Sequence, residues 1–185
     1  SLYVGAENGK LYAFDIDGNL RWTHSTDGSI YSSPAVSVDG NVYACSQDGA
    51  LYALGRDGSE LWTFETGGVS AVITGAIFAS PAIGPDGTVY IAGLYDPNLY
   101  ALDPNDGHIK WSCSFLDPCD PYAPKLRPFV SPVVAPDGTI YQTLFSNPER
   151  RIMESGDYSP FWYDSKLYAI YPNNGNIIWA TNMTE

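Results

Sequence analysis

One short unit recurs along the chain and constrains the fold more than any other feature of the sequence. An aliphatic-Tyr pair is followed by Leu-Tyr-Ala and then by a Trp, and this order is repeated from one end to the other. Self-similarity of this kind indicates a repeat architecture. The aliphatic-Tyr pairs are Leu2-Tyr3, Val42-Tyr43, Val89-Tyr90 and Ile140-Tyr141, and the closing tryptophans are Trp22, Trp62, Trp111 and Trp179.

Each unit predicts four short antiparallel β-strands. Runs rich in β-branched and aromatic residues alternate with Asp-Gly and Asn-Gly pairs, which are hairpin signals. Runs such as Leu-Tyr-Ala-Leu place apolar side chains on both faces of their sheet, so both faces must be covered. A small sheet that repeats every roughly 40 to 50 residues and is covered by its own neighbours is typical of a β-propeller blade.

The order of the strands predicts an incomplete ring. If the Ser-Pro segments at 33–34, 80–81 and 131–132 form the innermost strands, the chain starts on the second strand of one blade. Whether the other blades belong to the same polypeptide or to a second chain stays open. We expect an all-β segment over residues 1–185 with about four four-stranded antiparallel blades, the first lacking its inner strand, at approximately 1–25, 26–66, 67–114 and 115–185.

The closing segment of each unit resembles a known motif. Residues 101–111 and 169–179 follow Ala-x-Asp-x-x-x-Gly-x-x-x-Trp, with Tyr171 replacing the Asp in the second copy. Residues 13–22 and 53–62 are shorter by one residue. The pattern is similar to the tryptophan-docking motif of the quinoprotein alcohol dehydrogenase-like (PQQ-like repeat) β-propellers. The resemblance implies a ring of about seven or eight blades, in which each Trp ends the outer strand and packs against the adjoining blade.

The resemblance implies either catalysis or partner binding. Enzymes of the family hold pyrroloquinoline quinone between a Trp and a disulfide of adjacent cysteines, with Ca²⁺ held by Glu and Asn and with an Asp as base. The chain has no neighbouring cysteines, and none of those ligands can be matched residue by residue. We therefore expect no cofactor and a non-catalytic binding or scaffolding module. A fragment of a PQQ- and Ca²⁺-dependent dehydrogenase, or a structural subunit of a larger extracellular assembly, are the alternatives.

Every long insertion lies on one side of the predicted disc. Residues 67–78 and 112–129 cross between blades, and residues 144–166 join the second strand to the third, all opposite the short Asp-Gly turns. Cationic and aromatic side chains gather there, which favours a surface for an anionic or amphipathic partner. For any single side chain, pinning a loop to the scaffold is the alternative. The candidates are Tyr122, Lys125, Arg127, Arg150, Arg151, Tyr158, Phe161 and Trp162.

The charge balance excludes two partner classes. Asp and Glu number 21 against 9 Lys and Arg, which gives a net charge of -12. This charge argues against nucleic acid or an anionic membrane surface as the main partner, because like charges repel. The most apolar stretch, residues 71–79, is too short to insert into a membrane.

Two features bear on the compartment. Cys113 and Cys119 are spaced for a local disulfide, although two free thiols are the alternative. If the bond forms, the protein resides in an oxidising compartment, so we expect it to be secreted or periplasmic. Asn182 begins an N-glycosylation sequon, which has meaning only in a eukaryotic secretory protein. Cys45 lies in an apolar run and is expected to be a buried thiol.

A weak metal candidate lies near the first Asp-Gly turn. Asp15, Asp17 and Asn19 resemble the start of a Ca²⁺ loop, because alternate oxygen-bearing residues can converge on one ion. The downstream bidentate carboxylate of such a loop is absent. The same residues form an ordinary hairpin turn, which is the interpretation we favour.

Overall fold

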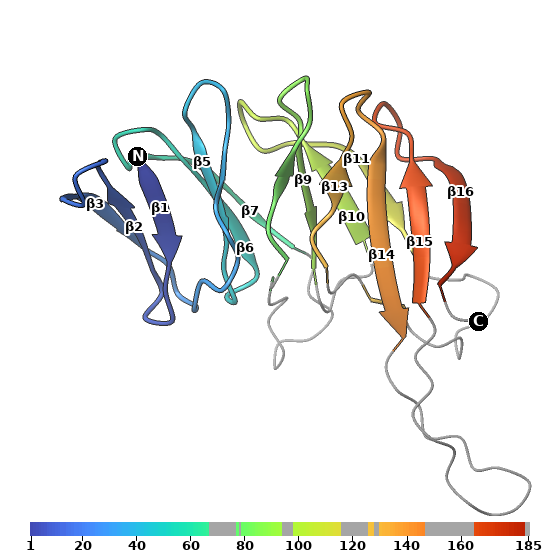
Figure 1. Ribbon diagram of the computed structural model, residues 1–185, viewed down its shortest axis with the longest axis horizontal. Helices are drawn as coiled ribbons and strands as arrows, with labels where there is room; N and C mark the ends of the chain where they lie inside the picture. Colours follow the sequence, from blue (N-terminus) through green and yellow to red (C-terminus); the bar gives the residue numbers. More distant parts are fainter. Residues whose placement is uncertain are drawn as a thin grey trace, which may run out of the picture.

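The fold is built from β-strands alone within the described residues. The computed structural model describes residues 1–66, 77, 79–93, 98–115, 126–127, 130–146 and 165–183. Four antiparallel sheets follow one another along the chain (Figure 1). The expected all-β propeller segment, with an incomplete first blade, is therefore confirmed.

The four sheets share one strand order, with each strand beside its neighbour in sequence. A short additional strand, β12 (Leu126–Arg127), also pairs with β14 and was not expected from the repeat. The first sheet consists of β1 (Leu2–Gly5), β2 (Lys10–Phe14) and β3 (Leu20–Ser25), and the second of β4 (Ala35–Val36), β5 (Val42–Cys45), β6 (Ala50–Leu54) and β7 (Glu60–Glu65). The third sheet consists of β8 (Ala82–Ile83), β9 (Val89–Ala92), β10 (Asn98–Leu102) and β11 (Ile109–Ser114), and the fourth of β13 (Val133–Val134), β14 (Ile140–Ser146), β15 (Ser165–Ile170) and β16 (Ile177–Asn182).

The outer hairpin of every sheet has the same irregularity. The register between the last two strands shifts directly after the Ala of Leu-Tyr-Ala, at Ala13, Ala53, Ala101 and Ala169. A shift at a fixed position bends each outer strand in the same way. The repeat in the sequence is therefore also a repeat in backbone geometry.

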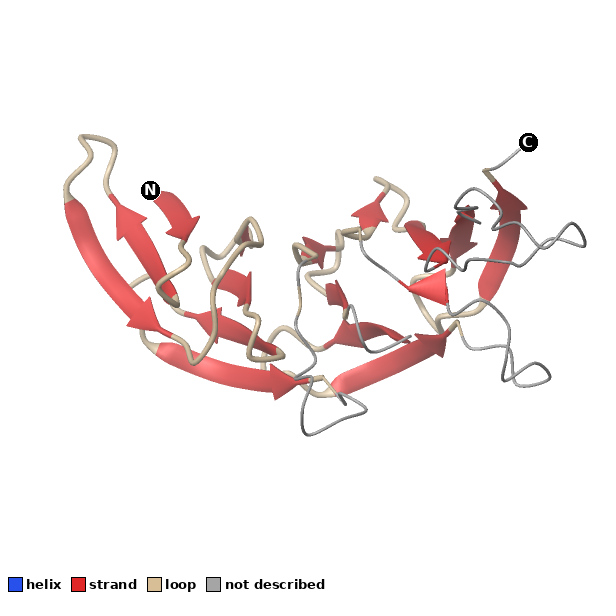
Figure 2. Cartoon of the chain, turned by 90° about the horizontal axis from the view of Figure 1, so that it is seen from below, coloured by secondary structure: helices blue, strands red, loops and turns tan. Residues whose placement is uncertain are grey.

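The hydrophobic core is divided into layers between consecutive sheets. Leu11 of the first sheet packs with Val42 and Leu54 of the second, and Tyr43 and Trp62 pack with Val89 and Leu102 of the third. A third layer joins the third and fourth sheets. Figure 2 shows the sheets along an arc, with the two termini near its tips. Each inner sheet therefore buries both of its faces against its neighbours, as its apolar runs require.

Two details of the sequence interpretation need correction. Each closing Trp is the third residue of a six-residue strand and does not end it, because the strand continues to pair for three more residues, as Trp62 shows in β7. The insertion expected over residues 144–166 is also shorter, because β14 continues to Ser146 and β15 begins at Ser165.

Candidate functional site

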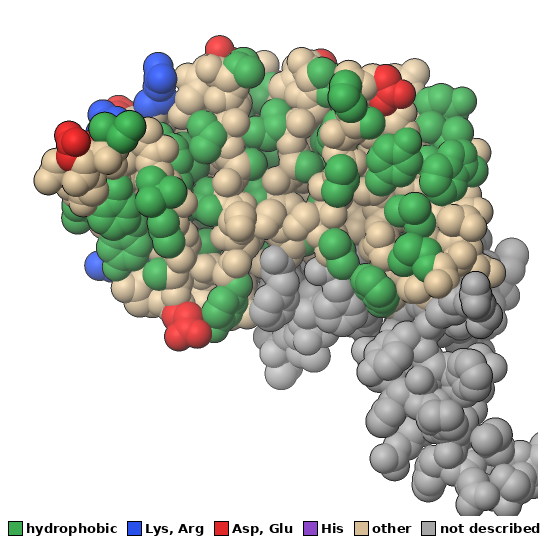
Figure 3. All heavy atoms as spheres, viewed as in Figure 1, with side chains coloured by type: hydrophobic (Ala, Val, Ile, Leu, Met, Phe, Trp, Pro, Cys, Tyr) green, Lys and Arg blue, Asp and Glu red, His purple; other side chains and the backbone are tan. Residues whose placement is uncertain are grey.

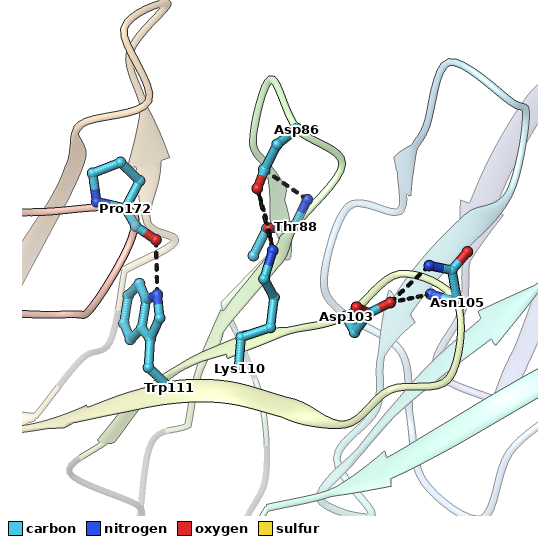
Figure 4. Close-up of polar contacts among 7 residues, drawn as sticks. All are labelled: Asp86, Thr88, Asp103, Asn105, Lys110, Trp111 and Pro172. Atoms are coloured by element: carbon cyan, nitrogen blue, oxygen red, sulfur yellow. Dashed lines mark hydrogen bonds and ion pairs between the residues drawn. The ribbon is translucent and has the colours of Figure 1, made fainter.

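The closing tryptophans hold consecutive sheets together by hydrogen bonds. The indole Nε1 of Trp62 donates to the carbonyl oxygen of Pro104 across 2.9 Å. Figure 4 shows the equivalent bond from Trp111 to the carbonyl of Pro172, at 2.8 Å. Trp22 makes the same bond to the carbonyl of Arg56, at 3.0 Å. Each acceptor lies in the outer hairpin turn of the next sheet.

A glycine lies under each of these indoles. A Cβ added to Gly58 would lie 2.7 Å from Trp22, one on Gly107 would lie 2.6 Å from Trp62, and one on Gly175 would lie 2.5 Å from Trp111. No side chain fits at such distances. We call the turn glycine together with its carbonyl acceptor an indole seat.

A tyrosine of the same sheet also packs beside each indole. The ring centroids of Tyr43 and Trp62 lie 5.8 Å apart, and those of Tyr90 and Trp111 also lie 5.8 Å apart. Centroids in this range give favourable tilted aromatic contacts. Burial raises the pKa of the Tyr90 hydroxyl to about 12. The tyrosine therefore stays neutral under ordinary conditions and contributes as a packing group.

Serine hydroxyls link the inner strands. The backbone N–H of Ser33 donates to Oγ of Ser80 across 2.8 Å, and the N–H of Ser80 donates to Oγ of Ser131 across the same distance. Strand β8 lies against both β4 and β13. The Ser-Pro segments were expected to form the inner strands, but these strands begin directly after them, at Ala35, Ala82 and Val133. The relay itself was not expected, although a Ser at the same position of each repeat was its signal.

The two ends of the arc expose the surfaces that are buried between inner sheets. Trp179 on β16 is 44% exposed, whereas Trp62 is 8% exposed. At the other end, Leu2 and Val4 are 61% and 41% exposed. Figure 3 shows apolar side chains gathered over the first sheet and again near the C-terminal end of the arc.

The hairpin of β14 and β15 extends beyond the other sheets on the long-insertion side. Six residue pairs join β14 to β15, whereas four join β5 to β6 and four join β9 to β10. Phe145 pairs with both Arg127 of β12 and Ser165 of β15. Figure 1 shows the tip of β14 reaching past the neighbouring strands. The β14–β15 hairpin therefore projects at the base of the longest insertion.

Most of the predicted partner-binding residues lie outside the described part of the chain. Arg127 is placed by its backbone in β12, at the edge of the projecting hairpin. The others remain predictions. They are Tyr122, Lys125, Arg150, Arg151, Tyr158, Phe161 and Trp162.

The weak Ca²⁺ candidate has the geometry of a turn. Oδ1 of Asp15 accepts hydrogen bonds from the backbone N–H groups of Asp17 and Asn19, at 2.9 and 2.8 Å, and Oδ2 accepts one from the Asn19 side chain at 3.0 Å. The bond from the Asn19 side chain, followed by the bond from its backbone, lowers the pKa of Asp15. The carboxylate thus stabilises its own hairpin.

Other Asp carboxylates also accept hydrogen bonds from residues of their own turns. Oδ1 of Asp103 accepts from the backbone and side chain of Asn105, both at 2.9 Å (Figure 4). Asp86 accepts from the Thr88 hydroxyl at 2.7 Å and forms an ion pair with Lys110 at 3.2 Å. Partial burial raises the pKa of Asp86, but the bonds from Thr88 and the Lys110 ammonium outweigh it, so its pKa is lowered overall. The acidity of the chain is therefore largely turn chemistry.

The cysteines are buried where the structure describes them. Cys45 is fully buried on β5 and Cys113 is buried on β11, and neither forms a disulfide with another described residue. Burial raises the pKa of both. Cys119 lies outside the described residues, so its pairing with Cys113 remains a prediction. Asn182 is exposed at the end of β16, and its glycosylation also remains a prediction.

Candidate metal ligands are not grouped within the described residues. In this part of the chain no group of three or more His, Cys, Asp or Glu residues could hold a metal ion. The carboxylates of Asp15, Asp86 and Asp103 are instead occupied by their own turns. This donor set does not fit a Ca²⁺ ion. The expectation of no cofactor, and the alternative of pyrroloquinoline quinone with Ca²⁺, both remain predictions.

The repeated sheets and their indole seats agree with a sequence match. The family model described as outer membrane protein assembly factor BamB matches residues 1–119. The chain belongs to this family. The BamB match spans β1 to β11, which are the first three sheets. A comparison with curated protein sequences finds no match.

Solved structures confirm the PQQ-like propeller fold. Quinohemoprotein alcohol dehydrogenase from Comamonas testosteroni superposes with a TM-score of 0.78 at 21% identity, over 98% of this chain and 33% of that protein. BamB from Moraxella catarrhalis gives a TM-score of 0.60 at 19% identity, over 99% of this chain and 61% of its own. A europium-containing methanol dehydrogenase gives 0.78 at 18% identity, over 98% and 40%. The chain thus spans less than two thirds of each of these proteins.

The described part of the chain contains no membrane-spanning helix. No helix there is long and apolar enough to cross a membrane.

Proposed function

We propose that this chain is a non-catalytic binding or scaffolding propeller segment that holds a protein or ligand partner on its long-insertion side. The observation that carries the proposal is the projecting β14–β15 hairpin, which is braced along its inner edge by β12 and β13. A rigid scaffold that presents long connections on one side is a common form of binding surface.

The family supports a protein partner. The matching family is described as an outer membrane protein assembly factor, which names an assembly role and no chemistry. By this relation we propose a periplasmic or otherwise secreted location and a partner belonging to an assembly of envelope proteins. The cationic residues predicted beside the hairpin favour an anionic or amphipathic surface on that partner.

Shortening the hairpin tests the proposal. Phe145 pairs with Ser165 at the described end of the hairpin, and Asn-Gly in place of residues 147–163 is designed to close it with a tight turn. Circular dichroism should show the four sheets intact. Val38, fully exposed in the β4–β5 turn on the opposite side, provides the control V38S. A partner captured from an envelope extract by wild type and V38S, and lost from the shortened chain, is the expected result. Equal capture by all three would refute the proposal.

The alternative of a quinoprotein dehydrogenase fragment is tested separately. The chain is mixed with pyrroloquinoline quinone, Ca²⁺, a primary alcohol and a redox dye. Because no group of His, Cys, Asp or Glu residues in the described part of the chain could hold Ca²⁺, we expect no dye reduction above that of the same mixture without protein. Protein-dependent reduction of the dye would overturn the non-catalytic part of the proposal.

A further inference from the structure

Gln142 occupies a position of the repeat that is apolar in the second and third sheets. In the register of β14 with β15 it takes the place that Ala44 has in β5 and Ile91 has in β9. It is 0% exposed and lies on the same face of β14 as Ile140, which packs on the third sheet. A buried polar side chain among apolar neighbours needs a physical reason, which packing of the core alone does not supply.

The amide group of Gln142 is only half satisfied. Its Nε2 donates to the carbonyl oxygens of Val130 and Thr143, both across 2.9 Å. Its Oε1 is buried and has no hydrogen-bond partner within the described residues. Because an unpaired buried acceptor lowers stability, an apolar side chain would suit the packing between the two sheets better. What Gln142 contributes is therefore the pair of bonds that its Nε2 donates.

The two carbonyl groups lie at an interruption in the inner edge of the fourth sheet. The short strands β12 and β13 both pair with that edge of β14, and their nearest pairs are at Phe145 and at Tyr141. Val130 lies between β12 and β13 in the sequence, and Thr143 lies between the two paired positions of β14. The Gln142 amide thus bridges the stretch where neither short strand pairs with the inner edge.

The second sheet closes the corresponding point with a different side chain. Ser32 and Cys45 hold there the positions of Val130 and Thr143. The Ser32 hydroxyl donates to the carbonyl of Cys45 across 2.8 Å and accepts from its N–H across 3.2 Å, and β5 ends at this residue. Val130 has no polar side chain, so in the fourth sheet the bond comes from β14 instead. Strand β14 then continues beyond the corresponding residue and pairs with β12.

We propose that Gln142 is the positioning residue of the projecting β14–β15 hairpin. Its amide ties the segment that leads into β13 to β14, next to the point where β14 pairs with β12. It thereby holds the part of β14 that reaches past the neighbouring strands (Figure 1). The inference rests on the proposed function, because the partner is placed at this hairpin. Gln142 is itself buried, so it acts on the partner through the position of β14 and not by contact.

Hydrogen exchange of the full chain, measured by mass spectrometry, tests this role. Gln142→Met keeps the length of the side chain and removes its amide. We expect the backbone amides of peptides that contain Phe145 and Ser146 to exchange about five-fold faster than in wild type, the factor that corresponds to one lost hydrogen bond. The amides of β5 should exchange as in wild type. Unchanged exchange at Phe145 and Ser146 would overturn the proposal.

The urea midpoint separates positioning of the hairpin from general support of the core. Met places an apolar group at an apolar position and leaves no buried acceptor, while the carbonyl of Val130, a residue 43% exposed, can bond to water instead. The urea midpoint of Gln142→Met should therefore equal or exceed that of wild type. Ile91→Met, at the same position of the third sheet, is the matched control and should leave exchange in β14 unchanged. Gln142→Leu repeats the measurements with a branched side chain. A lower midpoint in both Gln142 variants, or exchange that accelerates in every sheet, would contradict the proposal.

Partner capture then tests the link to binding. From the envelope extract, wild type and Ile91→Met should capture the same partner, and Gln142→Met should capture less of it. Full capture by Gln142→Met together with faster exchange in β14 would refute the role of Gln142 in binding. If wild type captures no partner and the exchange in Gln142→Met still accelerates, the proposed function is wrong but the role of Gln142 in holding β14 stands. The two failures are therefore distinguishable.

Discussion

The Trp62 indole donates to the carbonyl oxygen of Pro104 across 2.9 Å, although the two residues are 42 positions apart in the sequence. The bond joins the second sheet to the third, and the indole closes over Gly107 so tightly that no side chain fits there. Since each sheet buries its apolar faces only against its neighbours, such bonds fix how consecutive sheets are placed. The stability of the segment should therefore depend on the indole seats more than on any exposed residue.

Replacing Trp62 with Phe should destabilise the chain. Phe keeps an aromatic ring but cannot donate to Pro104, and its smaller volume leaves a gap between the sheets. We expect a loss of about 1 to 3 kcal/mol in the free energy of unfolding, measured by urea denaturation. Leu61, directly before Trp62 on the same strand, is exposed. Leu61→Ala therefore serves as the matched control and should change the free energy of unfolding by no more than about 0.5 kcal/mol. Equal losses in the free energy of unfolding would show that the Trp62 contact stabilises the chain no more than an exposed side chain does.

A pair of glycines separates backbone strain from collision with an indole. Gly107 and Gly18 have φ angles of 74° and 84°, so Ala is strained at both positions. At Gly107 the new Cβ would also lie 2.6 Å from Trp62, whereas at Gly18 it meets no described atom. We expect Gly107→Ala to cost about 1 to 3 kcal/mol more than Gly18→Ala. Both are compared by urea denaturation, and equal costs would contradict the close packing at Gly107.

The sequence predicted the parts of this fold that depend on short-range patterns. Asp-Gly turns mark where strands reverse, and the aliphatic-Tyr and Leu-Tyr-Ala runs place apolar groups on both faces, which demands neighbouring sheets. The bond from Ser33 to Ser80 spans 47 residues and depends on how two sheets are placed, so the repeated Ser indicates a shared position but not the bond itself. The lengthened β14 likewise depends on its pairing with β12, a strand of two residues that has no recognisable sequence signal.

The predicted binding residues illustrate the same division. The sequence located the insertions by comparing one repeat with the next, and the structure brings Arg127 to the edge of the projecting hairpin. The sequence did not indicate that the pairing of Phe145 with Ser165 extends the sheet into the insertion. Strand extension depends on pairing across the hairpin, whereas the repeat pattern describes only the part shared by all units.

Removing the Lys110 ammonium should raise the pKa of Asp86. Lys110 lies 3.2 Å from the Asp86 carboxylate and 2.6 Å from the Thr88 hydroxyl, and it helps to hold the pKa of Asp86 below its usual value (Figure 4). Lys110→Met keeps the length of the side chain without its charge. Carboxyl carbon NMR should show a higher pKa for Asp86, with less than about 1 kcal/mol lost in stability because the pair is exposed. Lys10→Met removes one charge elsewhere and should leave Asp86 unchanged; an unchanged Asp86 in both variants would rule out the proposed role of Lys110.

Acid should destabilise the chain through its turn carboxylates. Amide N–H groups of the turns donate to Asp103 and Asp137 and lower their pKa values in the folded state. A carboxyl with a lowered folded pKa stabilises the fold above its unfolded pKa, about 3.9, and the contribution is lost as the pH falls through the folded pKa. The urea midpoint should thus change little on this account between neutral pH and about pH 5, and should fall below about pH 4.

A single substitution tests this explanation of the acid sensitivity. Asn in place of Asp103 still accepts the turn hydrogen bonds at neutral pH but cannot be protonated in this range, so the variant should lose less stability on acidification than wild type. Asp17 has no hydrogen-bonded carboxylate within the described residues, and Asp17→Asn should retain the wild-type dependence on pH. If D103N and D17N instead respond identically to acid, the destabilisation comes from general charge repulsion and not from the turns.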